Sequence, residues 1–309
     1  MKDKTAGEPK ERADKNSSFP GPFIRALRVF LIITLILCAL VFLYALYTRT
    51  HYKIVYYHET SPKVAGSMRI AVISDIHNRE YGEENETLIS DLRALKPDLI
   101  LFPGDMVVRP PGDMIVREDE DCRATLHLIS ASAGIAPCYG VLGNHESERI
   151  YYKDDRALPE KLEKAGLRLL RNASVKIRIG GNRVRLIGVE GTAYGFEEYG
   201  GREFMENTEI DPSAFCILMT HIPILFDKQL SVYGFDLGIA GHVHGGIVKL
   251  PFIGGLYSHE EGFFPKYDAG KFILNNGQTL IVSAGLGDSK IFPPRINNTP
   301  ELTVIDINR

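Results

Sequence analysis

The sequence predicts a layered α/β domain that follows one membrane-spanning helix. An unbroken apolar run near the N-terminus predicts the helix. From Met68 onward, short apolar runs typical of strands alternate with segments of helical spacing, and later runs are joined as hairpins. This alternation favours sheets covered by helices. Several strand runs also lead directly into turns that contain Gly, Asp, Asn or His, which indicates a functional site.

The N-terminal segment divides into a polar tail and an apolar run. Residues 1–22 are rich in Lys, Glu, Asp and Pro, and we expect them to be disordered. Val29–Tyr47 contains no charged residue, and at 1.5 Å per helical residue it spans about 28 Å, close to the thickness of a bilayer core. Residues 23–48 are therefore predicted to be an uncleaved transmembrane anchor. A cleavable signal peptide is the alternative, although Ala45–Thr48 is a poor cleavage site.

The charges beside the apolar run bear on its orientation. Residues 1–28 hold seven Lys or Arg, and residues 48–70 hold four. The side richer in basic residues stays in the cytoplasm. We therefore expect a single-pass protein of the cell membrane with its C-terminal domain outside the cytoplasm.

Residues 49–66 are predicted to be a linker, and residues 67–309 one globular domain without repeats. The 309-residue length suffices for one domain of moderate size with appendages. Gly180-Gly181-Asn182 predicts a hairpin turn. The expected helices are Glu86–Leu95, residues 121–132 and Leu158–Ala165; the expected strands are Met68–Ser74, Asp98–Pro103, Cys138–Leu142, Val175–Ile179, Val184–Val189, Phe215–Thr220, Leu237–Ala240, Thr279–Ala284 and Leu302–Ile307.

Composition restricts the classes of partner. The net charge of -3 lacks the basic surplus that nucleic-acid binding requires, so we expect no nucleic-acid partner. No obligate protein partner is evident. The four cysteines form no CxxC pair, are expected to be free thiols, and leave the compartment open.

The strand ends carry the residues with chemistry. Five of the nine histidines fall in turns that directly follow predicted strands. Ligands bind α/β sheets at the carboxyl ends of strands, so these turns are expected to converge. The turn sequences are Ser74-Asp75-Ile76-His77, Gly104-Asp105, Gly143-Asn144-His145-Glu146, Thr220-His221 and Gly241-His242-Val243-His244.

This ordered set of motifs resembles the calcineurin-like metallophosphoesterase family from about Met68 to Ile307. The later segments Gly245-Gly246, Leu250–Gly254, Gly262–Tyr267 and Ser283–Gly287 resemble a bacterial branch of membrane-bound or exported phosphodiesterases. Some members of that branch are similar to UDP-2,3-diacylglucosamine hydrolases. The resemblance implies a four-layer α/β/β/α sandwich behind the transmembrane helix.

The resemblance also implies a centre of two divalent metal ions and hydrolysis of a phosphodiester or pyrophosphate by a metal-bridging hydroxide. Asp105 would bridge the ions. One ion would also take Asp75, His77 and His244, and the other Asn144, His221 and His242. The mixture of imidazole and oxygen ligands suits Mn²⁺, Fe or Zn²⁺.

Two further residues are expected to be catalytic. His145 would stabilise or protonate the leaving oxygen, or else serve only in support of the ligands, and Glu146 would hold its ring. Arg79 follows the first motif and is a candidate contact to a phosphate oxygen.

The segment Leu250–Tyr267 places aromatic and aliphatic residues among Gly and Pro directly after the last motif. It would either pack under the sheet edge or form an apolar lip for a lipid-linked substrate. Two departures from the family pattern are Val108, where an Asp is common, and the stretch Pro293–Asn298, which replaces an Arg/Gly-rich turn.

The predicted function is thus a membrane-anchored phosphodiesterase with a phosphoester substrate, lipid-linked or from the cell envelope. One alternative is a phosphomonoesterase or nucleotide phosphodiesterase with a soluble substrate. An alternative of another class is a non-catalytic metal-binding scaffold.

Overall fold

The computed structural model describes residues 21–108, 122–190, 196–197, 200–287 and 295–309. The chain forms two units, Met1–Tyr44 and Ala45–Arg309. Helix α1 (Gly21–Thr50) begins earlier and ends later than the predicted anchor, and is long and apolar enough to cross a membrane. Gly21 and Pro22, expected in the polar tail, belong to this helix, and the rest of that tail lies outside the described residues.

The first sheet of the larger unit has the strand order β1-β16-β2-β3-β4-β5. Strand β16 runs parallel to β1 and antiparallel to β2, and β2 to β5 are parallel to one another. Their bounds are β1 (Lys53–Thr60), β16 (Glu301–Asn308), β2 (Ser67–Val72), β3 (Leu99–Phe102), β4 (Cys138–Gly140) and β5 (Leu167–Leu169).

The second sheet has the order β14-β15-β9-β8-β7-β6. Its four central strands are parallel, while β14 and β6 pair antiparallel at the two edges, the latter through the predicted hairpin. The bounds are β14 (Gly270–Ile273), β15 (Thr279–Val282), β9 (Leu237–Ala240), β8 (Phe215–Met219), β7 (Asn182–Gly188) and β6 (Ala173–Ile179).

Alternation along the strands produces three apolar layers, because successive side chains of a strand point to opposite faces. Ile70 of β2 and Ile217 of β8 lie in the core between the sheets. Ala71 of β2 packs on the opposite face with helices α2 (Glu86–Leu95), α3 (Arg123–Ala133) and α5 (Leu158–Lys164).

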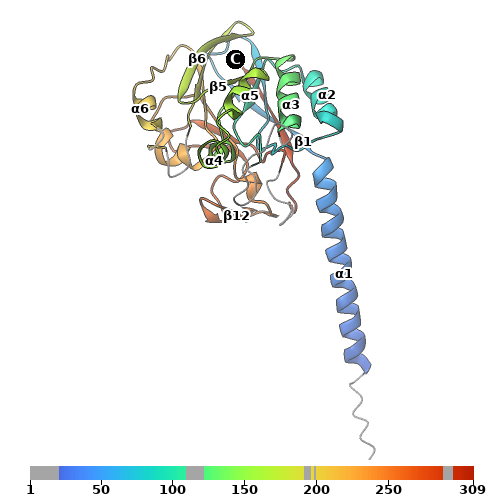
Figure 1. Ribbon diagram of the computed structural model, residues 1–309. Helices are drawn as coiled ribbons and strands as arrows, with labels where there is room; N and C mark the ends of the chain where they lie inside the picture. Colours follow the sequence, from blue (N-terminus) through green and yellow to red (C-terminus); the bar gives the residue numbers. More distant parts are fainter. Residues whose placement is uncertain (1–20, 109–121, 191–195, 198–199, 288–294) are drawn as a thin grey trace, which may run out of the picture. The chain divides into compact units, whose positions relative to one another are not determined.

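Leu218 of β8 packs on the outer face of the second sheet, with Phe226 of a π-helical turn and Met205 of α6 (Gly201–Glu206). Figure 1 shows α2 and α3 side by side, and α6 on the far side of the sheets. The predicted α/β class with two sheets between helical layers is confirmed.

Residues 49–66 differ from the expected linker, since they include β1, an eight-residue strand that pairs along its whole length with β16. Helix α4 (Asn144–Tyr152) and strand β5 were not predicted, nor was α6. The segment after the last motif forms two small antiparallel pairs, β10 (Lys249–Leu250) with β11 (Gly254–Gly255) and β12 (Tyr257–Ser258) with β13 (Gly262–Phe263).

The cysteines are free, as expected. Cys122, Cys138 and Cys216 are buried, whereas Cys38 in α1 is exposed. Burial raises the pKa of Cys138 and of Cys216 to about 12, which makes these thiols unreactive.

Candidate metal centre

The carboxyl ends of β2, β3, β4, β8 and β9 meet at one edge of the paired sheets. Within each of three overlapping groups, the ligand atoms lie within 4.8 Å of one another. The groups are Asp75 with His77 and His244, His77 with Asp105 and His145, and Asp105 with His221 and His242. Residues from both sheets therefore form one cluster of donors suited to cations.

Asp105 lies at the centre of this cluster. Its Oδ1 accepts the backbone N–H of His145 at 2.9 Å. Its Oδ2 lies 3.2 Å from Nε2 of His221 and 3.7 Å from Nε2 of His77. One oxygen is thus held by the backbone while the other faces histidines on both sides, which is the arrangement a bridging carboxylate needs.

The first half of the cluster contains Asp75, His77 and His244. The two imidazoles approach through their Nε2 atoms at 3.3 Å, and Nε2 of His244 lies 3.8 Å from Oδ1 of Asp75. The carboxylate of Asp75 also accepts the Ser74 hydroxyl and the backbone N–H of His242. These bonds hold the carboxylate in place beside the two rings.

The second half contains His221 and His242. Nε2 of His221 lies 3.1 Å from Nδ1 of His242. The carbonyl oxygen of Pro103 lies 2.8 Å from Nδ1 of His221, and because it can only accept, it selects the tautomer with a proton on Nδ1. The lone pair of Nε2 then faces the cluster, as in metal-bound histidines.

Asn144, the first residue of α4, supplies an independent indication of a cation. Its Oδ1 is buried and has no hydrogen-bond partner among the residues that the structure describes. Buried polar atoms are nearly always satisfied, so an orphan requires an explanation. A divalent ion bound by this amide oxygen would satisfy it, as expected from the sequence.

The backbone of the ligand turns is unusual. Five candidate ligands have positive φ, between 49° and 75°: Asp75, His77, Asp105, His242 and His244. Residues with side chains rarely adopt this conformation, and such strain clusters at functional sites. The adjacent glycines are required for close packing: a Cβ at Gly143 would lie 2.2 Å from Oδ1 of Asp105, and one at Gly241 2.3 Å from Oδ2 of Asp75.

Glu146 has partners that the sequence did not predict, while its predicted contact with the ring of His145 stays a prediction. The sequence analysis assigned it to the ring of His145, but its fully buried carboxylate accepts backbone N–H groups. These belong to Gly143 at 2.8 Å, Asp105 at 2.9 Å and Val107 at 2.8 Å. Glu146 thus ties the β3 and β4 turns together and positions Asp105.

Burial and mutual charge set the ionisation of the cluster. Burial alone would raise the pKa of Asp105, but His221 and His145 hold it well below its usual range. Burial would lower the pKa of His221, but Asp105 raises it to about 10, so a cation bound at Nε2 would replace a proton there. Burial lowers the pKa of His77, and burial and the nearby Asp105 raise that of Glu146 to about 7. An anionic carboxylate surrounded by imidazole nitrogens is a site that a cation fits.

A family model for calcineurin-like phosphoesterases matches residues 68–246, more than half of the chain. The chain belongs to this metallophosphoesterase family. It is 30% identical over 219 residues to an uncharacterized metallophosphoesterase of Aquifex aeolicus, covering 69% of this chain and 73% of that one. It is a metal-dependent phosphoester hydrolase, and the family uses divalent metals.

Two other relatives are similar over comparable lengths. The uncharacterized metallophosphoesterase YkuE of Bacillus subtilis is 27% identical over 243 residues, 77% of this chain and 78% of that one. The phosphodiesterase YaeI of Escherichia coli is 25% identical over 255 residues, 79% and 83% of the two chains. None of these three relatives is named as a UDP-2,3-diacylglucosamine hydrolase, so the predicted resemblance to those enzymes is not confirmed.

The remaining predicted residues are His145, which belongs to the cluster, and Arg79. The side chain of His145 is 11% exposed, its Nε2 lies 3.9 Å from Oδ2 of Asp105, and its ring contacts that of His77 edge-on. Arg79 lies two residues beyond His77 and is half-buried. Whether these two residues touch substrate stays a prediction.

The sequence analysis missed Arg295, Asn298 and Glu260. Arg295 is buried, donates to the carbonyl oxygen of Ala284, and places Nη2 3.2 Å from Nδ1 of His244. Asn298 donates to the carbonyl oxygen of His244. The stretch that departs from the family pattern thus supports this turn in its described part, while Pro293 and Pro294 lie outside the described residues.

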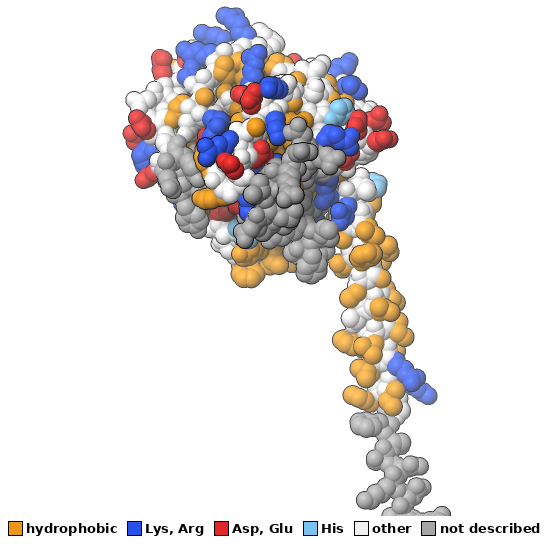
Figure 2. Space-filling model, in the orientation of Figure 1, with side chains coloured by type: hydrophobic (Ala, Val, Ile, Leu, Met, Phe, Trp, Pro, Cys, Tyr) orange, Lys and Arg blue, Asp and Glu red, His pale blue; other side chains and the backbone are white. Residues whose placement is uncertain are grey.

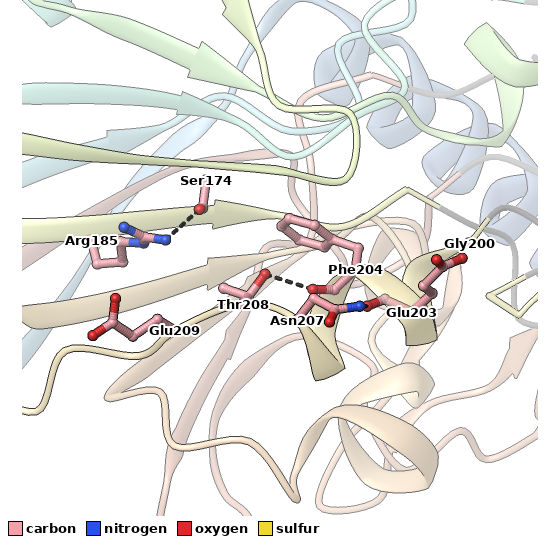
Figure 3. A pocket seen from close by; sticks show the side chains of 8 residues that line it. All are labelled: Ser174, Arg185, Gly200, Glu203, Phe204, Asn207, Thr208 and Glu209. Atoms are coloured by element: carbon pink, nitrogen blue, oxygen red, sulfur yellow. Dashed lines mark hydrogen bonds between the residues drawn. The ribbon is translucent and has the colours of Figure 1, made fainter.

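A separate hollow of about 550 Å³ lies between α6 and strands β6 and β7, lined by residues that include Ser174, Arg185 and Thr208. Figure 3 shows the Arg185 side chain bonded to Ser174, and Thr208 bonded to the backbone of Phe204. The hollow shares no residue with the candidate metal centre. The hollow has no part in the function we derive.

Proposed function

We propose that the chain is a membrane-anchored dinuclear phosphodiesterase that hydrolyses a phosphodiester or pyrophosphate bond of a lipid-linked or cell-envelope substrate. The central support is Asp105, whose Oδ2 faces His77 on one side and His221 on the other. Two ions 3.5–4 Å apart, the usual spacing of such centres, need an anionic bridge of this kind.

The remaining donors divide between two ions. Asp75, His77 and His244 would hold one, and Asn144, His221 and His242 the other, with Mn²⁺, Fe or Zn²⁺ suited to the donors. Two bound ions would lower the pKa of water for attack at phosphorus and would neutralise charge on the phosphoryl group.

His145 is proposed to act on the leaving group. Its backbone N–H is bound by Asp105, which fixes the residue at the cluster, while its side chain remains partly open to solvent. An imidazolium at this place would donate its proton to the departing oxygen. Arg79 would bind a non-bridging phosphate oxygen.

The exposed apolar side chains after the last ligand support a lipid-linked substrate. Phe252, Ile253, Tyr257, Phe263 and Phe264 are exposed, and we call them the aromatic lip. Figure 2 shows hydrophobic side chains gathered at the edge of the domain where Figure 1 places β12. Contiguous exposed apolar surface is typical of lipid or protein contact.

Helix α1 supports the membrane anchor by length and composition, and the excess of basic residues before it favours a catalytic domain outside the cytoplasm. The name of the Escherichia coli relative, a phosphodiesterase, favours a diester substrate.

The deciding experiment measures hydrolysis of bis-p-nitrophenyl phosphate by the full-length protein in detergent, with Mn²⁺ or EDTA, beside Asp105→Asn. We expect activity with Mn²⁺ that EDTA abolishes, and a loss of at least about 1,000-fold in the variant, equivalent to about 4 kcal/mol. Two metal ions per wild-type chain should accompany the activity. Full binding of ions without hydrolysis of any diester or monoester would favour a non-catalytic scaffold.

A further inference from the structure

Glu260 contacts a metal-ligand histidine from outside the known motifs. It lies in the turn between β12 and β13, and its Oε2 is 2.5 Å from Nε2 of His242. The side chain of Glu260 is 17% exposed and that of His242 is 9% exposed. Water therefore screens this contact little, and its geometry matters for the ring of His242.

The other ring nitrogen of His242 faces the metal centre. Its Nδ1 lies 3.1 Å from Nε2 of His221. A neutral imidazole carries one N–H, and a carboxylate can only accept. Oε2 and Nε2 are not aligned as a hydrogen bond, but a carboxylate charge 2.5 Å from Nε2 of His242 favours a proton on that nitrogen. The lone pair of Nδ1 is then directed at the centre.

His221 provides an internal comparison. Pro103 binds its Nδ1, so this ring presents Nε2 to the centre. The two neighbouring ligands are thus held in opposite tautomers, one by a backbone carbonyl and the other by a carboxylate. Acceptors of this type orient metal-bound histidines, and their removal commonly costs 10–100-fold in metal affinity.

We propose that Glu260 is a positioning residue for the second metal ion: it fixes the tautomer and ring orientation of His242. The inference rests on the proposed dinuclear function. It also connects the metal centre to the aromatic lip, because Glu260 is carried by the β12–β13 hairpin, in which Tyr257 pairs with Phe263.

The hairpin itself holds Glu260 in place. The backbone N–H of Glu261 donates to the hydroxyl of buried Ser258 at 3.1 Å. The rings of Tyr257 and Phe263 contact each other edge-on at 5.4 Å. A change in the position of the hairpin would therefore move the carboxylate that orients His242.

The test compares Glu260→Ala and Glu260→Gln with the matched control Glu261→Gln. Glu261 is adjacent, but its carboxylate accepts the backbone N–H of Lys266. Full-length protein in detergent is stripped with chelator, and Mn²⁺ binding is measured by calorimetry. Binding of Co²⁺ is followed by its visible spectrum, which reports ligand geometry independently of activity.

We expect Glu260→Ala to lower the affinity for one of the two Mn²⁺ ions by about 10–100-fold and to leave the affinity for the other unchanged. The Co²⁺ spectrum should also change. Glu260→Gln should lose less metal affinity than Glu260→Ala, because an amide oxygen can still accept the N–H at Nε2 of His242. Glu261→Gln should match wild type. Two ions of wild-type affinity with an unchanged spectrum in Glu260→Ala would overturn the inference, whereas failure of the wild type to bind two ions would overturn the proposed function instead.

Discussion

The aromatic lip directly follows the last of the strand-end turns in sequence, but the two regions differ in construction. The turns are largely buried, carry five candidate ligand residues with positive φ, and are held by hydrogen bonds such as those of Glu146. The lip is carried by strands of two residues, and Phe263 is 70% exposed. A rigid centre beside an adaptable surface lets one chemistry serve a particular substrate.

The largest effect is expected in the turns, for His145. Replacing His145 with Ala should lower kcat for an alkyl diester by about 100- to 10,000-fold, because general acid catalysis supplies that much. A p-nitrophenyl ester should lose much less, since its leaving group needs no proton. The measurement is kcat for both esters in one preparation. Equal losses for both esters would remove the proton-donor role and leave His145 as support for Asp105.

The rigidity of the turns is tested at Gly143. Gly143→Ala puts a Cβ into the space occupied by Oδ1 of Asp105, and overpacking of this kind costs about 1–3 kcal/mol. Calorimetry should show a lower Tm and weaker metal binding. Gly234→Ala is the matched control, since nothing lies within 4 Å of its added Cβ. An unchanged Tm and affinity in Gly143→Ala would show that the turns are more adaptable than we infer.

A smaller effect is expected for Arg79→Ala. Loss of a charge-assisted hydrogen bond to phosphate, worth about 1.5–3 kcal/mol, should raise KM by roughly tenfold or more. The metal content should stay at the wild-type value, because a guanidinium group has no lone pair to offer a metal ion. Steady-state kinetics of the diester measures both parameters. An unchanged KM would exclude Arg79 from the substrate site.

The smallest effect is expected in the lip and only with one class of substrate. Phe263→Ser combined with Phe264→Ser should lower kcat/KM several-fold for a lipid phosphodiester, and leave a soluble diester unaffected. Both side chains are exposed, and surface substitutions change stability by about 0.5 kcal/mol or less. Rates on mixed micelles and on the soluble diester are compared. Equal losses on both would make the lip part of the fold and end the contrast between the two regions.

The sequence predicted regular elements well where burial follows a simple period. Helix α2 has the predicted bounds, with Leu88 and Leu92 on its buried face. Helix α4 escaped prediction because its buried face includes Glu146 and Arg149, so the apolar period is lost. Strand β1 escaped because its pairing with β16 joins opposite ends of the domain, and no local pattern reports such a partner.

The sequence by itself indicated which candidate donor residues gather in the cluster. Asp, Asn and His each follow a buried strand, and the carboxyl ends of parallel strands converge. Only the tertiary structure decided how the donors point. That Asp105 offers Oδ2, that His221 offers Nε2 while His242 offers Nδ1, and that Glu260 approaches His242 all depend on contacts between distant segments. Spacing along the chain fixes the order of residues, whereas side-chain direction follows from backbone conformation and packing.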